Sequence, residues 1–120
     1  MIIETVRVSE KAKTQLTTLK KRTGIQNWNV LCRWALMMSL AETTVPPHED
    51  IISDSNIEMT WKVFAGQFDE VIRAVTLERA HKDGVSESKL QEFFKLHLHR
   101  GIAYLLMAPH GLPALFAVEK

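Results

Sequence analysis

The strongest constraint on the fold of this chain is a helix-length stretch, residues 30–40, that is apolar on almost every side. Its apolar members are Val30, Leu31, Cys32, Trp34, Ala35, Leu36, Met37, Met38 and Leu40. A helix without a polar face must be enclosed on most sides by other elements. Asn27 or Asn29 can cap its first turn. Because the chain has only 120 residues, we expect another subunit to supply part of the enclosure.

A short strand is predicted near the N-terminus, over Ile2–Val8. Val6 and Val8 fall on one side and Thr5 and Arg7 on the other, which is the alternation of a half-buried strand. A lone strand needs a partner, so it must pair either with a later strand or with the same strand of another subunit.

A helix is predicted between this strand and the apolar stretch. Ser9 is a suitable N-cap, and Gly24 is a suitable left-handed residue to end the helix after Thr23. Its apolar residues recur at the spacing of one buried stripe and are Ala12, Leu16 and Leu19.

Proline, serine and acidic residues interrupt the pattern over residues 43–60, which we interpret as an exposed loop linking two helical halves. Ile57–Phe64 is rich in β-branched and aromatic residues and is predicted to be a short strand or extended segment. A third helix is expected over Gln67–Lys82, ended by Gly84 after Asp83. The residues expected on its buried face are Phe68, Val71, Ile72 and Val75.

A fourth helix, capped by Ser86 or Ser88, is predicted to run to Leu105. Gly101 interrupts its pattern, and a glycine there costs about 1 kcal/mol unless close packing or a kink compensates. The tail from Pro109 onward is expected to dock its apolar residues on the body, through Leu115, Phe116, Ala117 and Val118.

These patterns predict a mainly α fold in one domain, residues 1–120, with a short N-terminal strand followed by about four helices. The first part, residues 1–42, has the strand–helix–helix order of a ribbon–helix–helix module, and residues 61–120 form a helical second half. A single cysteine excludes an internal disulfide. No run of residues is apolar enough for a membrane span, and no signal peptide is recognisable, so we expect a soluble, cytoplasmic protein.

Charge is distributed unevenly along the chain, although the net charge is only +1. Residues 1–42 hold seven basic and three acidic groups, whereas residues 43–120 hold eight basic and eleven acidic groups. This asymmetry directs an anionic partner to the first third of the chain. The alternative is an ordinary solvated helix face. The candidate nucleic-acid contacts are Arg7, Lys11, Lys13, Lys20, Lys21 and Arg22.

The turn after the first helix is the best candidate for a phosphate site, because three basic residues precede Gly24 and a helix N-terminus follows it. Trp28, Trp34 and Trp61 could stack on bases. Trp34 lies on the apolar helix and is expected in the core. Trp28 lies near the helix start beside the glycine turn and is the tryptophan to test.

We find no catalytic constellation and predict no catalytic residue, cofactor or metal site. His97 and His99 point about 200° apart on a helix, so they cannot chelate one ion, and we interpret His97 as a core or interface histidine. Cys32 could be a sulfur-accepting nucleophile, but its apolar neighbours favour a buried structural thiol.

The first forty residues resemble a ribbon–helix–helix module, and most of the chain resembles the DndE family of DNA sulfur-modification proteins. One matching segment is Leu16-x-x-Leu19-Lys20-x-Arg22-Thr23-Gly24-Ile25, followed by an apolar helix with Arg33. The other is His97-Leu98-His99-Arg100-Gly101-Ile102-Ala103-Tyr104-Leu105.

This resemblance implies a small, mainly helical, tetrameric protein that binds double-stranded DNA, including nicked DNA, through surface lysines. It also implies that the sulfur chemistry, which replaces a non-bridging phosphate oxygen of DNA, belongs to the other Dnd proteins. Carried onto this chain, the resemblance makes the basic residues between Lys11 and Arg22 the DNA contacts. The acidic second half is then assigned to assembly or to partner proteins.

Three alternatives remain open at this point. The first is a ribbon–helix–helix repressor or antitoxin that reads the major groove with Thr5 and Arg7. The second is a pure assembly protein that recruits catalytic subunits. The third is an enzyme that transfers sulfur through Cys32.

Overall fold

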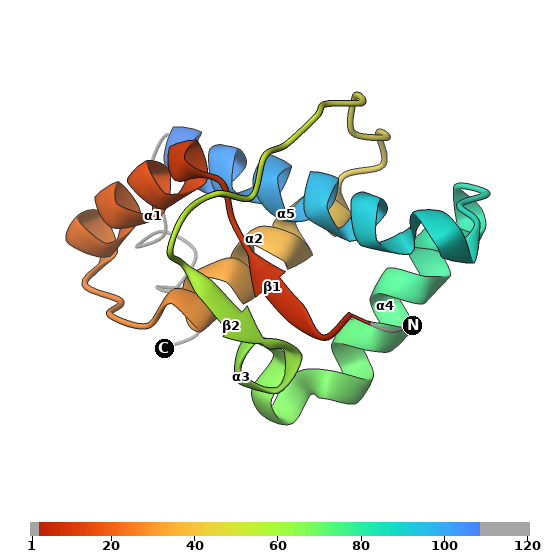
Figure 1. Ribbon diagram of the computed structural model, residues 1–120, viewed down its shortest axis with the longest axis horizontal. Helices are drawn as coiled ribbons and strands as arrows, with labels where there is room; N and C mark the ends of the chain where they lie inside the picture. Colours follow the sequence, from red (N-terminus) through yellow and green to blue (C-terminus); the bar gives the residue numbers. More distant parts are fainter. Residues whose placement is uncertain (1–2, 109–120) are drawn as a thin grey trace.

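The computed structural model describes residues 3–108 as a mainly helical fold with one small sheet (Figure 1). The elements in chain order are β1 (Thr5–Arg7), α1 (Glu10–Thr23), α2 (Trp28–Ala41), β2 (Glu58–Thr60), α3 (Trp61–Ala65), η1 (Gly66–Phe68), α4 (Asp69–Lys82), η2 (Glu87–Lys89) and α5 (Leu90–Met107). Four long helices match the expected fold, and α3 adds a short fifth one. The predicted tail from Pro109 onward lies outside the described residues, as do Met1 and Ile2.

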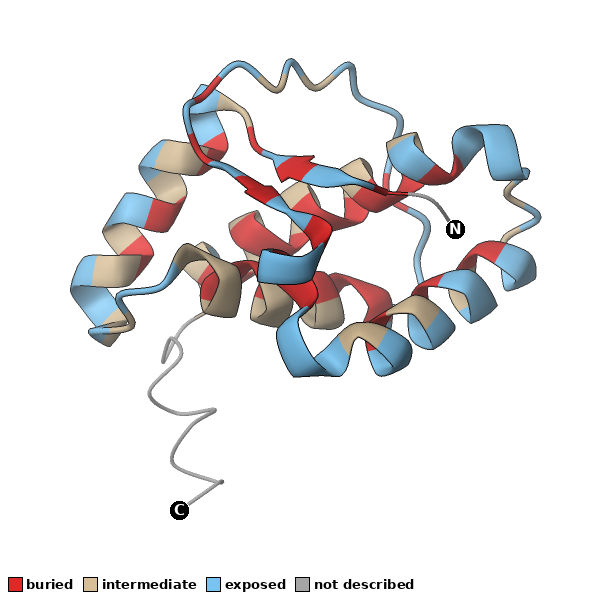
Figure 2. Cartoon of the chain, turned by 60° about the horizontal axis from the view of Figure 1, so that its bottom comes forward, coloured by how far each residue is buried: buried red, intermediate tan, exposed pale blue. Residues whose placement is uncertain are grey.

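The core forms where α2 and α5 cross, with α1, α3 and the sheet packed around this pair. Buried residues lie on the inward sides of the helices, and α1 and α4 lie on opposite sides of the molecule (Figures 1 and 2). On α2 the buried residues are Leu31, Cys32, Ala35, Leu36, Ser39 and Leu40. Most of the enclosure predicted for α2 therefore comes from its own chain. None of the helices in residues 3–108 combines the length and apolar character needed to cross a membrane.

The ends of α1 follow the predicted capping. The Ser9 hydroxyl accepts a hydrogen bond from the Ala12 N–H at 3.1 Å. Gly24 takes φ +76°, and its N–H donates to the Lys20 carbonyl. Ala12, Leu16 and Leu19 are fully buried, as the stripe predicts.

The N-terminal strand pairs within the chain. β1 and β2 are antiparallel, with Val6 opposite Met59 and Thr5 opposite Thr60. This pairing selects the first of the two predicted partners, a later strand, and it also corrects two predicted boundaries. The segment expected as a linker over residues 43–60 is irregular only to Ile57, because its last three residues form β2. The extended segment expected over Ile57–Phe64 ends at Thr60, whose hydroxyl accepts from the Val63 N–H and starts α3.

The prediction for the buried face of α4 was right for Ile72 and wrong for its other three residues. The buried residues are Ile72, Thr76 and Ala80, whereas Val71 is 59% exposed and Phe68, which belongs to η1, is 44% exposed. Thr76 and Ala80 are small, so this side of α4 can lie close to the core, and the bulkier residues remain outside. Val75 is also exposed.

Arginines from the second half secure the C-terminal end of α2. The Arg79 guanidinium donates to four carbonyls at this end, those of Leu40, Glu42, Thr43 and Thr44. The Arg100 guanidinium donates to both the hydroxyl and the carbonyl of Ser39. Carbonyls at a helix C-terminus lack intrahelical partners, and cations there also interact well with the helix dipole.

Gly101 explains how α5 approaches α2 so closely. α5 continues through this position without a break, so the predicted interruption is absent. A β-carbon added at Gly101 would overlap the backbone carbonyl of Ala35 on α2. The helix-interior cost of glycine is therefore offset by close packing, one of the two compensations expected from the sequence.

We expect Gly101→Ala to destabilise the fold by about 1–3 kcal/mol, because the new methyl group must force α5 away from Ala35. Urea unfolding of the wild type and the variant measures this difference. Ala103→Gly, in the same helix, is the matched control and should cost only about 1 kcal/mol through helix propensity. A Gly101→Ala variant more stable than the wild type would contradict the close packing.

Candidate nucleic-acid interface

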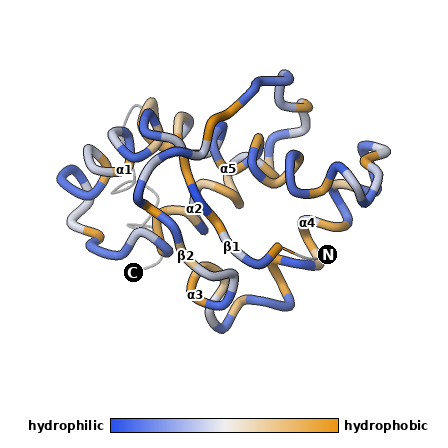
Figure 3. Tube along the Cα trace, viewed as in Figure 1, coloured by the Kyte–Doolittle hydropathy of each residue, from blue (hydrophilic) through white to orange (hydrophobic). Residues whose placement is uncertain are grey.

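The cations of α1 lie around its buried stripe as the helical spacing predicts. Lys13 and Lys20 are half-buried beside the stripe, whereas Lys11, Lys21 and Arg22 are exposed. Hydrophilic residues recur along this helix (Figure 3). Within residues 3–108, no carboxylate forms an ion pair with any of these five residues. Their charges are therefore available to an anion.

Three of these cations gather where α1 ends and α2 begins. Lys20, Lys21 and Arg22 form the last turn of α1, and we call them, with the first turn of α2 (residues 28–30), the positive corner. The Lys20 ammonium lies 3.5 Å from the centroid of the Trp28 ring, a cation–π contact that joins the two helices. The contact occupies one face of the Trp28 ring, which was predicted from the sequence as a base-stacking residue.

The start of α2 adds backbone donors to the positive corner. Asn27 occupies the N-cap position, but its side chain makes no capping hydrogen bond, and the Asn29 side chain donates to the Val63 carbonyl instead. No described residue accepts a hydrogen bond from the backbone N–H groups of residues 28–30. Free amides at a helix N-terminus, together with the helix dipole, favour phosphate binding.

Arg22 also has a structural role. Its guanidinium donates to the Leu106 carbonyl at 3.0 Å, which ties the end of α1 to the end of α5. The same bond brings a cation to the C-terminal end of a helix, where the dipole favours it. A substitution at Arg22 would therefore change the fold as well as the charge.

The remaining predicted contacts lie away from the positive corner. Arg7 is on β1, and its Nε donates to the Ser55 carbonyl at 2.8 Å. Lys11 and Lys13 are in the first turn of α1, roughly 13 Å from the last turn along the helix axis. Carboxylates accompany that end, because the Glu10 N–H donates to Asp54 at 3.1 Å. Of the six predicted residues, the structure thus brings only three together.

Comparison with known proteins identifies the family. The family model described as DNA sulphur modification protein DndE matches residues 5–110. The chain belongs to the DndE family. The crystal structure of DndE from Escherichia coli B7A, involved in DNA phosphorothioation modification, has a TM-score of 0.73 and 21% identity, and the alignment covers 88% of this chain and 98% of that one.

A second DndE crystal structure has the same fold. It is a glycine-to-lysine DndE mutant involved in DNA phosphorothioation, with a TM-score of 0.67, 16% identity, and coverage of 88% of this chain and 100% of that one. A search of curated proteins found no relative that matches this chain.

Cys32 is the thiol that the sequence offered as a possible sulfur acceptor. The side chain is completely buried in α2. Burial raises the pKa of the Cys32 thiol to about 12, and the positive charge of Arg33 only partly opposes this shift. Since the thiolate is the nucleophile, the folded protein holds Cys32 in its unreactive form.

The two histidines of α5 point to different neighbours, as the helical spacing predicts. His99 Nε2 accepts a hydrogen bond from the Ser9 N–H at 3.1 Å, and its Nδ1 lies 2.8 Å from the Lys95 carbonyl. His97 is completely buried, with Nδ1 2.8 Å from the Ser39 hydroxyl. Both therefore act as structural links, and among residues 3–108 no three histidine, cysteine or acidic side chains form a metal-binding group.

His97 is held neutral. Burial, with the positive charges of Arg100 and Arg79, lowers the pKa of His97 to about 4, against a smaller opposite effect of Asp83. Arg100 also donates to the Ser39 hydroxyl, so the hydroxyl proton is directed to His97 Nδ1. The neutral ring thus links α5 to α2.

This pKa predicts a loss of stability in mild acid. An unfolded histidine has a pKa near 6.5, so the unfolded chain binds a proton between pH 6.5 and 4 that folded His97 does not bind. Stability therefore falls as pH decreases, by about 2 kcal/mol from His97 between pH 7 and pH 5. Chemical denaturation at the two pH values measures the loss.

The control for this prediction is His97→Gln, which removes the titrating ring and leaves His99 in place. Over the same pH interval, the free energy of unfolding of the variant should fall by about 2 kcal/mol less than that of the wild type. An equal pH dependence in both proteins would show that His97 is not held neutral.

Proposed function

We propose that this DndE-family chain is a non-catalytic subunit of a DNA phosphorothioation complex that holds double-stranded DNA by its backbone. The observation that carries the proposal is the positive corner. There, Lys20, Lys21 and Arg22 stand beside the open N-terminus of α2, and none of them forms an ion pair with a described carboxylate.

The chemistry of the positive corner suits phosphate oxygens rather than base edges. Lysine ammonium groups and backbone amides contact phosphates without reading sequence. Each lysine that neutralises a phosphate releases condensed counterions, which makes affinity fall steeply with salt. The expected binding is therefore strong at low ionic strength and nearly independent of sequence.

The proposal assigns the sulfur chemistry to the other Dnd proteins. Its support in this chain is the buried thiol of Cys32, which has a raised pKa and therefore little thiolate character. A chain that presents phosphate contacts but holds its thiol in the core is suited to positioning DNA for a partner.

Assembly is a further part of the proposal. A tetramer, which the family resemblance implies, would multiply the number of positive corners on one particle. Several weak phosphate contacts on one assembly bind DNA more tightly than one corner alone. The acidic surface of residues 43–108 would then face the partner proteins rather than the DNA.

We expect the double variant Lys20→Ala, Lys21→Ala to bind duplex DNA more weakly at every sequence. The slope of log affinity against log salt should become shallower by about 2, one for each lost phosphate contact. Fluorescence anisotropy on intact and nicked duplexes over a salt series measures both quantities.

The matched control removes two exposed lysines near the junction of α4 and α5, Lys82→Ala with Lys89→Ala. This pair changes the net charge equally but lies on the α4 side of the molecule, opposite α1 (Figure 1). Equal losses in both double variants would show that net charge, rather than the positive corner, drives binding.

The assignment of sulfur chemistry to partner proteins predicts that Cys32→Ala retains activity. Removing a buried thiol leaves a small cavity, so the expected cost is about 1 kcal/mol of stability and no loss of modification. Measuring phosphorothioate linkages in DNA from cells that carry only the variant tests this. Absence of the linkages at normal protein abundance would place Cys32 in the reaction.

A further inference from the structure

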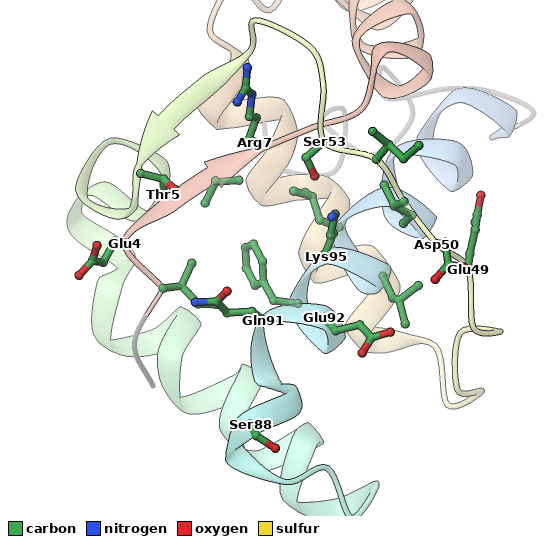
Figure 4. Close-up of a pocket in the computed structure, with 17 residues that line it drawn as sticks. Glu4, Thr5, Arg7, Glu49, Asp50, Ser53, Ser88, Gln91, Glu92 and Lys95 are labelled. Atoms are coloured by element: carbon green, nitrogen blue, oxygen red, sulfur yellow. The ribbon is translucent and has the colours of Figure 1, made fainter.

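A groove runs along the free edge of the small sheet, on the side of β1 away from β2 (Figure 4). Its walls are β1, the segment of residues 49–53, and the start of α5 with the preceding turn, from Ser88 to Leu98. Its volume is about 890 Å³, which is at the upper end of the range that holds a drug-sized ligand. We call it the edge groove.

The edge groove exposes unpaired backbone groups of β1. In an antiparallel pair, alternate residues direct their N–H and C=O groups toward the partner strand. The Glu4 carbonyl accepts from the Trp61 N–H, and the Val8 N–H donates to the Ile57 carbonyl; both partners directly flank β2. Thr5 and Arg7 therefore direct their N–H and C=O groups away from β2. No described residue hydrogen-bonds to these groups.

The edge groove is acidic, unlike the positive corner. Four carboxylates line it (Glu4, Glu49, Asp50 and Glu92) against two cations (Arg7 and Lys95). Asp50 and Glu92 each have a carboxylate oxygen 3.2 Å from a ring nitrogen of His48. Glu4 and Glu49 have no ion-pair partner among residues 3–108 and lie at opposite ends of the groove (Figure 4).

We propose that the edge groove binds an extended, lysine- or arginine-bearing segment of a partner protein, which adds to β1 as a third strand. Backbone groups of the segment pair with Thr5 and Arg7, in the manner of strand addition to an exposed sheet edge. Its basic side chains reach Glu4 and Glu49. DNA does not fit the edge groove, because the carboxylates that line the groove would repel phosphate groups.

A second copy of β1 is a poorer fit for the edge groove. That strand carries Arg7 but also Glu4 beside it, so it brings no net positive charge to an acidic site. Pairing between two copies would also place two acidic groove walls against each other. The charge pattern therefore favours a basic segment from a different protein.

Amide hydrogen exchange on the intact protein tests the proposal directly. The probes are two blocked strand-length peptides of about six residues, one alternating lysine with valine and the other glutamate with valine. With the basic peptide at about ten times its Kd, the exchange of the Thr5 and Arg7 amides should slow by about tenfold. Unchanged exchange of these two amides, or equal binding of the acidic peptide, would overturn the proposal.

Two sets of variants extend the test. Thr5→Pro removes one outward N–H and should lower the affinity for the basic peptide by about fivefold. Thr5→Val keeps this N–H and should bind the peptide as the wild type does. The double variant Glu4→Gln, Glu49→Gln leaves the backbone intact and should lower the affinity for the same peptide by about tenfold. If the glutamine double variant bound the basic peptide as well as the wild type does, the proposal would be overturned. The same conclusion would follow if two copies of the protein paired through β1 and the peptide did not bind.

The binding roles proposed for the edge groove and for the positive corner can be tested independently. The glutamine double variant should bind DNA at least as well as the wild type, because it removes negative charge away from the positive corner. The Lys20→Ala, Lys21→Ala variant should bind the basic peptide unchanged. A loss of peptide binding in the lysine variant would contradict the separation of the two surfaces.

Discussion

The fold depends on the close contact between α2 and α5 at Gly101. The absence of a side chain there lets α5 reach the backbone of Ala35, which joins the second half of the chain to the first. The same approach brings the end of α5 to the end of α1, where Arg22 bonds the Leu106 carbonyl. One residue of the positive corner, Arg22, is therefore held by α5, whose position depends on the contact at Gly101.

Arginine and lysine have different roles in this protein. The guanidinium is a planar fork that donates several hydrogen bonds at once, whereas the ammonium is a compact, well-hydrated charge. Five arginines each donate to a backbone carbonyl, namely Arg7, Arg22, Arg33, Arg79 and Arg100. The lysines of α1 make no such bond among the described residues. Structural hydrogen bonds thus engage these five arginines, and Lys20 and Lys21 carry most of the charge that we assign to DNA binding at the positive corner.

Local signals in the sequence predicted much of the fold. Ser9, Gly24 and the stripe through Leu16 fixed the bounds and buried face of α1, because capping and periodicity act within a few residues. The buried face of α4 was predicted correctly only at Ile72, because the side that packs also depends on which small residues meet the core, here Thr76 and Ala80, and this is a tertiary property. The extended segment around β2 was predicted too long, because the N-capping of α3 by Thr60 ends the strand early.

The candidate site was predictable in composition but not in arrangement. Residue types identified all the cations of α1, and the helix N-terminus after Gly24 was expected to hold phosphate. The sequence could not show that Arg7 and Arg22 bond carbonyls, that Lys20 lies over Trp28, or that Asn27 leaves the first turn of α2 open. The bonds of Arg7 and Arg22 and the contact of Lys20 each join two different elements, so they depend on how the elements pack and are not visible in the local sequence pattern.

The central claim is that duplex DNA meets the chain where α1 ends and α2 begins. Backbone amide chemical shifts, recorded while a short duplex is added at low salt, test it most directly. We expect the largest changes at residues 20–24 and 28–30, with little change at residues 4–7. Changes concentrated on β1 and the edge groove, with residues 20–30 unaffected, would contradict it.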